Sequence, residues 1–104
     1  MSVSKDKSGI GQIDDVIHGR LRLGIMTYLL NAEVADFTEL KKALDATQGN
    51  LSIHMRKLED AGYVAIEKSF LDRKPLTQIR ITKAGREALK VYVAALSSLL
   101  GPLD

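Results

Sequence analysis

Residues 51–64 read LSIHMRKLEDAGYV, and the apolar residues of this stretch recur at helical spacing. At about 100° per residue, Leu51, Met55 and Leu58 return to one side of a helix, together with Gly62. The opposite side carries Gly49, Ile53, Arg56, Lys57 and Asp60, with Ser52 on the flank. The pattern predicts an amphipathic helix that buries one face in a core and ends at Gly62.

Two runs of alternating apolar and polar residues follow this helix. They predict paired strands at 63–70 and 76–82. The loop between them, 71–75, contains Asp72-Arg73-Lys74-Pro75 and forms the charged end of a hairpin. When the loop is taken alone, a solvated turn is the better explanation of these charges, so their interest comes from their position close after the amphipathic helix.

Capping signals predict another helix on the N-terminal side of the amphipathic helix described above. Asp36 or Thr38 can cap a helix over 39–45, and Glu39 follows Asp36 at capping-box spacing. A turn at 46–49 follows, in which Thr47 can cap the helix quoted above. Two helices joined by such a turn form a helix-turn-helix. A further helical region is expected at about 14–32, with a break near Gly19.

The last helix is expected over 83–100, ended by Gly101 and Pro102. Its apolar stripe covers roughly 200° of the helical wheel. The helical region at 14–32 carries two separate apolar stripes. A homodimer would cover this surface, whereas a deeper three-helix core within one chain is the alternative. The expected interface residues are Leu23, Met26, Leu30, Leu89, Tyr92, Val93, Leu96, Leu99 and Leu100.

The 104 residues suffice for one small domain, expected at 13–101 between a flexible arm at 1–12 and a tail at 102–104. Cysteine is absent, which removes disulfides, thiolate metal sites and cysteine nucleophiles. No phosphate loop, metal-ligand spacing or Ser-His-acid set is present, so we expect neither an enzyme nor a cofactor. Without a signal-peptide core or a membrane-length apolar run, we expect a cytoplasmic protein with no membrane partner.

The charge distribution is more informative than the net charge of +2. Residues 48–86 carry eight Lys/Arg against four Asp/Glu, whereas 1–47 and 87–104 each sum to −1. A basic helix and hairpin are typical of a nucleic-acid footprint. Ile53 on the outer face suits contact with a thymine methyl, and Ser52 and Arg56 suit hydrogen bonds to bases or phosphates. An isolated surface isoleucine is the ordinary alternative.

The element order over 14–100 resembles the winged-helix transcriptional regulators of bacteria and archaea, in particular the compact group related to the ArsR and MarR types. The matching stretches are RLGIM at 22–26, FTEL at 37–40, NLS at 50–52, LEDAGYV at 58–64 and ITKAGR at 81–86. The resemblance implies an α+β, mainly α fold: a winged helix-turn-helix with a two-stranded wing and N- and C-terminal dimerisation helices.

The resemblance also implies a homodimeric, sequence-specific regulator of double-stranded DNA. Its recognition helix would enter the major groove, and its wing would contact the adjacent minor groove or backbone. The implied contacts come from Gln48, Asn50, Ser52, Ile53 and Arg56 on the helix and from Arg73 and Lys74 on the wing. We add Lys57 from the outer face of the helix, and His54, whose place on the flank suits a phosphate contact.

Two departures from the family pattern matter. Position 53 is often polar in such helices, and here it is isoleucine. Metal-sensing members use Cys or His clusters, but this chain has no Cys and only His18 and His54. The alternative function is a winged-helix protein-interaction module that does not bind DNA. A small-molecule effector of unknown identity would lodge between the first and last helices.

Overall fold

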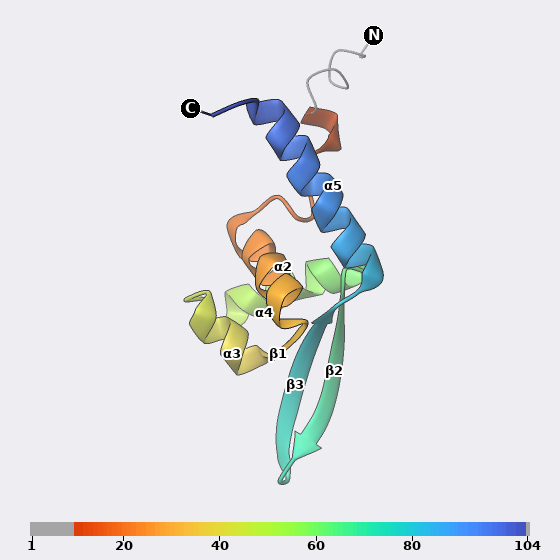
Figure 1. The fold of residues 1–104 in the computed structure, drawn as a ribbon. Helices are drawn as coiled ribbons and strands as arrows, with labels where there is room; N and C mark the ends of the chain where they lie inside the picture. The colour runs from red at the N-terminus through yellow and green to blue at the C-terminus, as the bar shows by residue number, and fades with distance from the viewer. Residues whose placement is uncertain (1–9, 104) are drawn as a thin grey trace.

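The computed structural model describes residues 10–103 (Figure 1). The elements, in chain order, are the 3₁₀ turn η1 (Ile10–Gln12), α2 (Arg20–Ala32), β1 (Val34–Asp36), α3 (Phe37–Ala43), α4 (Gln48–Asp60), β2 (Val64–Leu71), β3 (Lys74–Ile81) and α5 (Lys83–Leu100). The hairpin β2–β3 and the long helix α5 extend in opposite directions from the bundle of α2, α3 and α4. The molecule is therefore elongated, at 57 × 30 × 23 Å.

Three helices begin at side-chain N-caps, and the sequence predicts the caps of α3 and α4. The Asp36 carboxylate accepts a hydrogen bond from the Glu39 amide at 2.7 Å, and the Glu39 carboxylate accepts one from the Asp36 amide, which completes a capping box. The Thr47 hydroxyl caps α4 by accepting a hydrogen bond from the Asn50 amide, and the Thr82 hydroxyl caps α5 by accepting one from the Gly85 amide. Because Asp36 is the cap, α3 begins at Phe37, two residues earlier than the expected helix.

The sheet has three antiparallel strands in the order β1-β3-β2, so the expected two-stranded hairpin β2–β3 is joined by a third strand that was not expected. The additional strand, β1, pairs Ala35 with Ile79 of β3. The turn of the hairpin is also shorter than expected. Leu71 pairs with Lys74, which leaves only Asp72 and Arg73 in the turn, and both have positive φ angles, 53° and 69°. This is the backbone sign of a type I′ turn, which matches the twist of paired strands.

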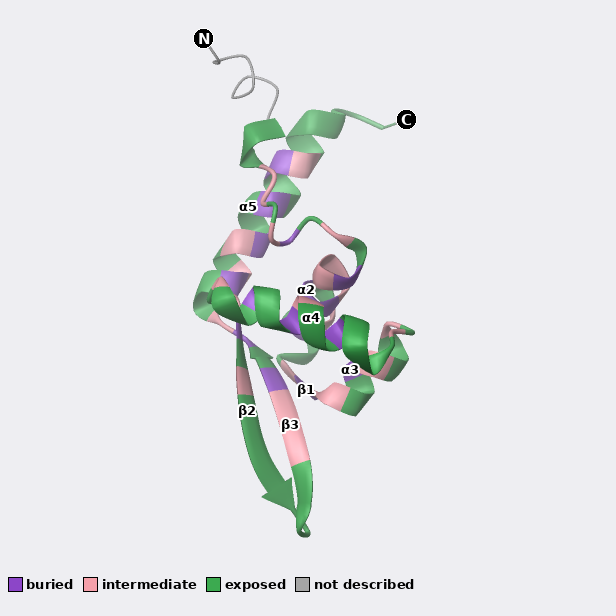
Figure 2. Cartoon of the chain, turned by 180° about the vertical axis from the view of Figure 1, so that it is seen from behind, coloured by how far each residue is buried: buried purple, intermediate pink, exposed green. Residues whose placement is uncertain are grey.

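The core lies where α2, α4, α5 and the sheet meet. Figure 2 shows the buried residues as single stripes along the helices and at the base of the hairpin, with the outer half of the hairpin exposed. The largest fully buried side chains are Ile17, Ile25, Met26, Leu29, Leu40, Leu51, Leu58, Ile79 and Leu89. None of the helices within 10–103 combines the length and the apolar composition needed to cross a membrane.

The segment before α2 differs from both expectations made for it. Residues 14–19 form turns rather than the start of a helix, and the Asp14 carboxylate accepts hydrogen bonds from the amides of Val16 and Ile17. Ile10–Gln12, placed by expectation in a flexible arm, form the 3₁₀ turn η1, which packs near α5. The remainder of that expected arm, 1–9, lies outside the described residues.

The end of α4, the base of the hairpin and the start of α5 meet at four residues, Gly62, Tyr63, Thr82 and Gly85, which we call the helix–hairpin junction. Gly62, with φ of 83°, ends α4. The Thr82 hydroxyl donates to the Gly62 carbonyl at 2.7 Å, and the Thr82 amide donates to the Tyr63 carbonyl at 3.0 Å. The backbone of Gly85 lies so close to the Tyr63 carbonyl that only glycine fits there.

The Tyr63 side chain joins the junction to the segment before α2. Its hydroxyl donates a hydrogen bond to the Asp14 carboxylate. This hydrogen bond, with burial and the nearby negative charge, raises the pKa of Tyr63 to about 12. The phenol is therefore neutral throughout the physiological range and remains a donor, so that Asp14 anchors the turn at 14–19 to the end of α4.

The junction predicts a large effect of Gly85→Ala. A Cβ atom at position 85 would lie 2.1 Å from the Tyr63 carbonyl oxygen, and backbone must move to relieve this overlap. We expect a loss of about 3 kcal/mol in the free energy of unfolding, measured by urea denaturation. The control is Gly49→Ala in α4, where a Cβ meets nothing within 4 Å. That variant should match the wild type or gain up to about 1 kcal/mol. Equal stability of the two variants would contradict the account of the junction.

Candidate nucleic-acid interface

Helix α4 presents a polar outer face because its apolar stripe is anchored in the core. Leu51, Met55 and Leu58 are at most 2% exposed. Nine residues of α4 are exposed, namely Gln48, Gly49, Asn50, Ser52, Ile53, Arg56, Lys57, Glu59 and Asp60. Ile53 is 57% exposed, and no apolar neighbour covers it. The helix therefore offers cations, amides, a hydroxyl and one aliphatic group to whatever approaches it, with two carboxylates, Glu59 and Asp60, at its C-terminal end.

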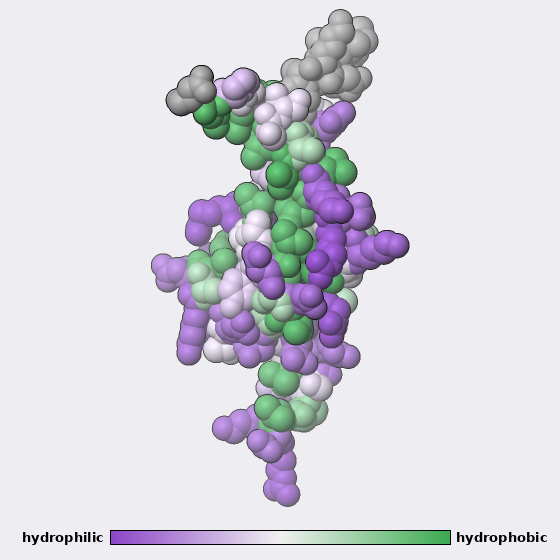
Figure 3. Space-filling model, viewed as in Figure 1, coloured by the Kyte–Doolittle hydropathy of each residue, from purple (hydrophilic) through white to green (hydrophobic). Residues whose placement is uncertain are grey.

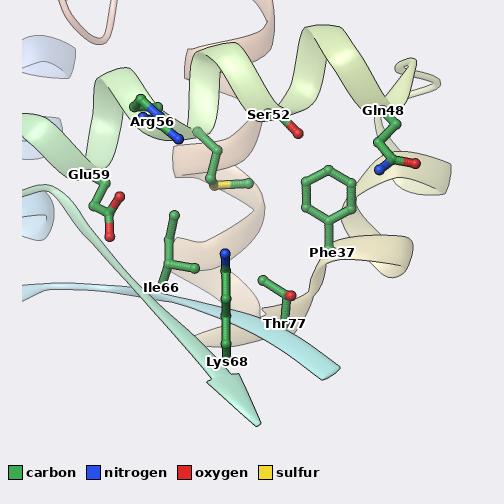
Figure 4. Close-up of a pocket in the computed structure, with 9 residues that line it drawn as sticks. Phe37, Gln48, Ser52, Arg56, Glu59, Ile66, Lys68 and Thr77 are labelled. Atoms are coloured by element: carbon green, nitrogen blue, oxygen red, sulfur yellow. The ribbon is translucent and has the colours of Figure 1, made fainter. Parts of the chain in front are cut away.

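A groove separates α4 from the hairpin, and Figure 4 shows the side chains that line it. Its volume is about 590 Å³. We call it the α4–β2 groove; its lining residues are Phe37, Gln48, Ser52, Met55, Arg56, Glu59, Ile66, Lys68 and Thr77. Lys68 extends from the hairpin toward the helix, opposite the wall that carries Ser52 and Arg56. The groove thus has a cation on each wall.

The chemistry of the α4–β2 groove suits a polyanion. Arg56 and Lys68 supply positive charge, and Gln48, Ser52 and Thr77 supply neutral hydrogen-bonding groups between them. Arg, Lys, Ser, Thr and Gln side chains make most of the contacts to phosphate oxygens in protein–DNA complexes. Glu59 is the one carboxylate among the lining residues. A phosphodiester strand is therefore a suitable occupant of this groove.

His54 lies on the inner flank of α4 and faces α2 rather than solvent. Its Nδ1 atom lies 2.7 Å from the Arg22 guanidinium, which can only donate. The imidazole is therefore the acceptor and is neutral. Burial lowers the pKa of His54 below its usual 6.5, and the positive charges of Arg22 and Lys57 lower it further. Arg22 also donates to the Val16 carbonyl, so that it joins the turn before α2 to α4.

Residues 21–100 match the family described as a winged helix DNA-binding domain. This match covers most of the chain. The chain belongs to the winged helix DNA-binding domain family. It is also 36% identical to an uncharacterized protein of Methanocaldococcus jannaschii over 84 residues, which cover 81% of this chain and 91% of that protein.

Solved structures agree with this assignment. A transcriptional regulator homologue from Pyrococcus horikoshii is 35% identical, with a TM-score of 0.82, covering 94% of this chain and 95% of that one. A MarR-family regulator from Silicibacter pomeroyi shares the fold at 13% identity, with a TM-score of 0.59, covering 97% of this chain and 70% of that one. The expected winged-helix family is confirmed, and the expected likeness to the ArsR and MarR types is seen in the fold. The matched family is described as a DNA-binding domain, and the 35% identical structure is described as a transcriptional regulator homologue.

Helix α4 and the β2–β3 hairpin stand where the recognition helix and the wing were expected, so the expected site residues can now be located. The α4–β2 groove brings Gln48, Ser52 and Arg56 together. Asn50, Ile53 and Lys57 are exposed on α4 but do not line this groove. Arg73 and Lys74 are exposed at the end of the wing, apart from the others (Figure 1). The hydrogen bond to Arg22 directs His54 away from this surface and argues against its expected phosphate contact.

Sequence reasoning missed Lys68 and Thr77, the two polar residues among the three wing residues that line the groove. They are directly paired across the hairpin. A signal was present, since Lys68 continues the alternating positions of Val64 and Ile66, whose side chains face the core. Where a strand extends beyond the core, a polar residue on its core-facing side indicates the wall of a groove.

The Arg22–His54 pair predicts a pH-dependent stability. Because the pKa of His54 is lower in the folded chain than the unfolded value of 6.5, its contribution to stability is present above 6.5 and is lost as the pH falls through the folded value. We expect the free energy of unfolding to fall between about pH 7.5 and 5.5. His54→Gln keeps an acceptor for Arg22 and should remove part of this fall. Superimposable pH profiles of the two proteins in urea denaturation would contradict the prediction.

Proposed function

We propose that this chain is a homodimeric, sequence-specific regulator that binds double-stranded DNA, with α4 in the major groove and the wing on the adjacent minor groove or backbone. The α4–β2 groove is the observation that carries the proposal, because it places Arg56 and Lys68 on facing walls. In double-stranded DNA, one sugar-phosphate strand separates the major from the minor groove. A helix on one side and a wing on the other leave that strand between them.

The dimensions support this arrangement. The major groove is about 12 Å wide and admits an α-helix. Each strand of the wing has eight residues and spans about 26 Å. A wing of this length extends past the phosphate strand to the next groove, where Arg73 and Lys74 meet phosphates or the groove itself. The exposed Ile53 and Asn50 on α4 are then placed to contact base edges, which carry the sequence information.

The salt dependence of binding tests the phosphate contacts. Arg56→Ala and the double change Arg73→Ala/Lys74→Ala should each weaken binding about tenfold and reduce the slope of log K against log salt by about 1 for each lost phosphate contact. Fluorescence anisotropy with a duplex, repeated from low to physiological salt, measures both quantities. The control is Arg80→Ala, an exposed arginine that pairs with Ala65 on the other face of the same sheet. Unchanged affinity and slope in the first two variants would exclude these contacts.

A second copy of the chain is proposed to cover the apolar surface of α5. Val93, Leu99, Leu100 and Leu30 of the expected interface are exposed, and Leu23 and Leu96 are partly exposed. Met26, Leu89 and Tyr92 are at most 3% exposed within one chain, so the protomer's own core already holds them and they contribute little to an interface. A hollow of about 420 Å³ between Leu30 and Val93 leaves room for side chains of the second copy.

Two matched valines on α5 test the dimer. Val93 and Val91 are 55% and 56% exposed, but they lie on nearly opposite sides of the helix, and only Val93 lines the hollow. Val93→Glu would place a charged carboxylate in the apolar interface and should raise the dimer dissociation constant by more than about tenfold. Val91→Glu should leave it unchanged. Analytical ultracentrifugation measures both, and a dimer that Val93→Glu does not weaken would contradict the proposed surface.

The exposure of Ile53 favours a second candidate, in which α4 docks a protein partner instead of DNA. The two functions differ in how binding responds to salt. A random-sequence duplex pool, bound at low salt and sequenced, would yield an enriched palindromic site if a dimer reads two half-sites. Absence of binding at low salt would favour the protein-docking function.

A further inference from the structure

The outer part of the wing carries two large apolar side chains with no partner in the protomer. Phe70 is 74% exposed and Leu71 is 61% exposed. In Figure 3, hydrophobic atoms gather on the wing just before its hydrophilic tip. A two-residue turn with strands of good β propensity does not need an exposed phenylalanine, so the fold alone does not account for it.

The pairing register places Phe70 on the face of the wing that continues the α4–β2 groove. Lys68 pairs with Thr77, and Phe70 pairs with Pro75 two residues farther out. Side chains two residues apart on a strand share a face, so Phe70 and Pro75 follow Lys68 and Thr77 outward from α4. Pro75 also lines a neighbouring hollow together with Thr77 and Gln48. Leu71 belongs to the opposite face.

The distance from Phe70 to the turn, compared with the depth of the minor groove, decides how far Phe70 and Pro75 can enter DNA. Phe70 lies two residues before Asp72, about 7 Å behind the turn. The minor groove is about 7.5 Å deep and about 6 Å wide, narrower than a two-stranded ribbon with its side chains. The ribbon therefore cannot enter beyond its turn, and Phe70, behind the turn, remains at the mouth of the groove. At the mouth the groove wall consists of deoxyribose rings, whose carbon atoms form an apolar surface.

We propose that Phe70 and Pro75 pack against the deoxyribose wall at the mouth of the minor groove and form an apolar, sequence-independent contact between the wing and DNA. This inference rests on the proposed function. The flanking charges favour DNA over a second copy of the chain, because Lys68 lies on the inner side of the pair and Arg73 and Lys74 lie beyond it. These cations would hold the phosphates on either side of the sugars that Phe70 contacts.

The substitution Phe70→Ser tests the contact, with Leu71→Ser as the matched control on the other face. Half-burying a phenylalanine contributes about enough free energy for a tenfold change in affinity. We therefore expect Phe70→Ser to bind about tenfold more weakly to its preferred duplex and to random duplex alike. The slope of log K against log salt should not change, because no phosphate contact is lost. Leu71→Ser should change the affinity less than about twofold.

The salt series separates this contact from an electrostatic one, and the random duplex separates it from a base contact. An unchanged affinity of Phe70→Ser, a loss shared equally by Leu71→Ser, or a loss confined to the preferred sequence would each overturn the inference. A dimer dissociation constant raised by Phe70→Ser would assign the side chain to a second copy of the chain instead. Failure of the wild type to bind any duplex at low salt would overturn the proposed function itself, which distinguishes the two outcomes.

Discussion

The hydrogen bonds of Thr82 to the backbone of Gly62 and Tyr63 hold the recognition helix, the wing and α5 in one arrangement. The same hydroxyl caps α5 by accepting from the Gly85 amide. One residue, through its hydroxyl and its backbone amide, therefore joins the end of α4 to both the base of the wing and the start of α5. Since α4 and the wing leave this point in fixed directions, the junction also sets the width of the α4–β2 groove.

Much of this arrangement could be predicted because its determinants are local. Caps and C-terminal glycines act within a few residues, and the stretches at 58–64 and 81–86 contain both sides of the junction. The missed strand β1 has three residues and owes its conformation to pairing with β3, more than 40 positions away. The two-residue turn was missed because Asp72-Arg73 lacks the glycine that usually marks such turns.

The same difference between local and long-range determinants decides which parts of the candidate site could be predicted. Helical periodicity identified the outward residues of α4, since their exposure follows from the burial of Leu51, Met55 and Leu58. The inward direction of His54 could not be predicted, because it depends on Arg22, 32 positions earlier in the chain. The wide apolar stripe of α5 likewise indicated more apolar surface than one protomer covers. It could not show that the protomer itself buries Leu89 and Tyr92.

The modest charge of the chain limits what phosphate contacts can contribute. With a net charge of +2, the whole molecule generates little long-range attraction, so the cations are effective only where the fold gathers them, at the α4–β2 groove and the wing tip. Electrostatic affinity of this kind falls steeply with salt, whereas contacts between apolar groups do not. A binding surface with few cations therefore gains most from apolar groups between them, and Ile53 and Phe70 occupy such positions.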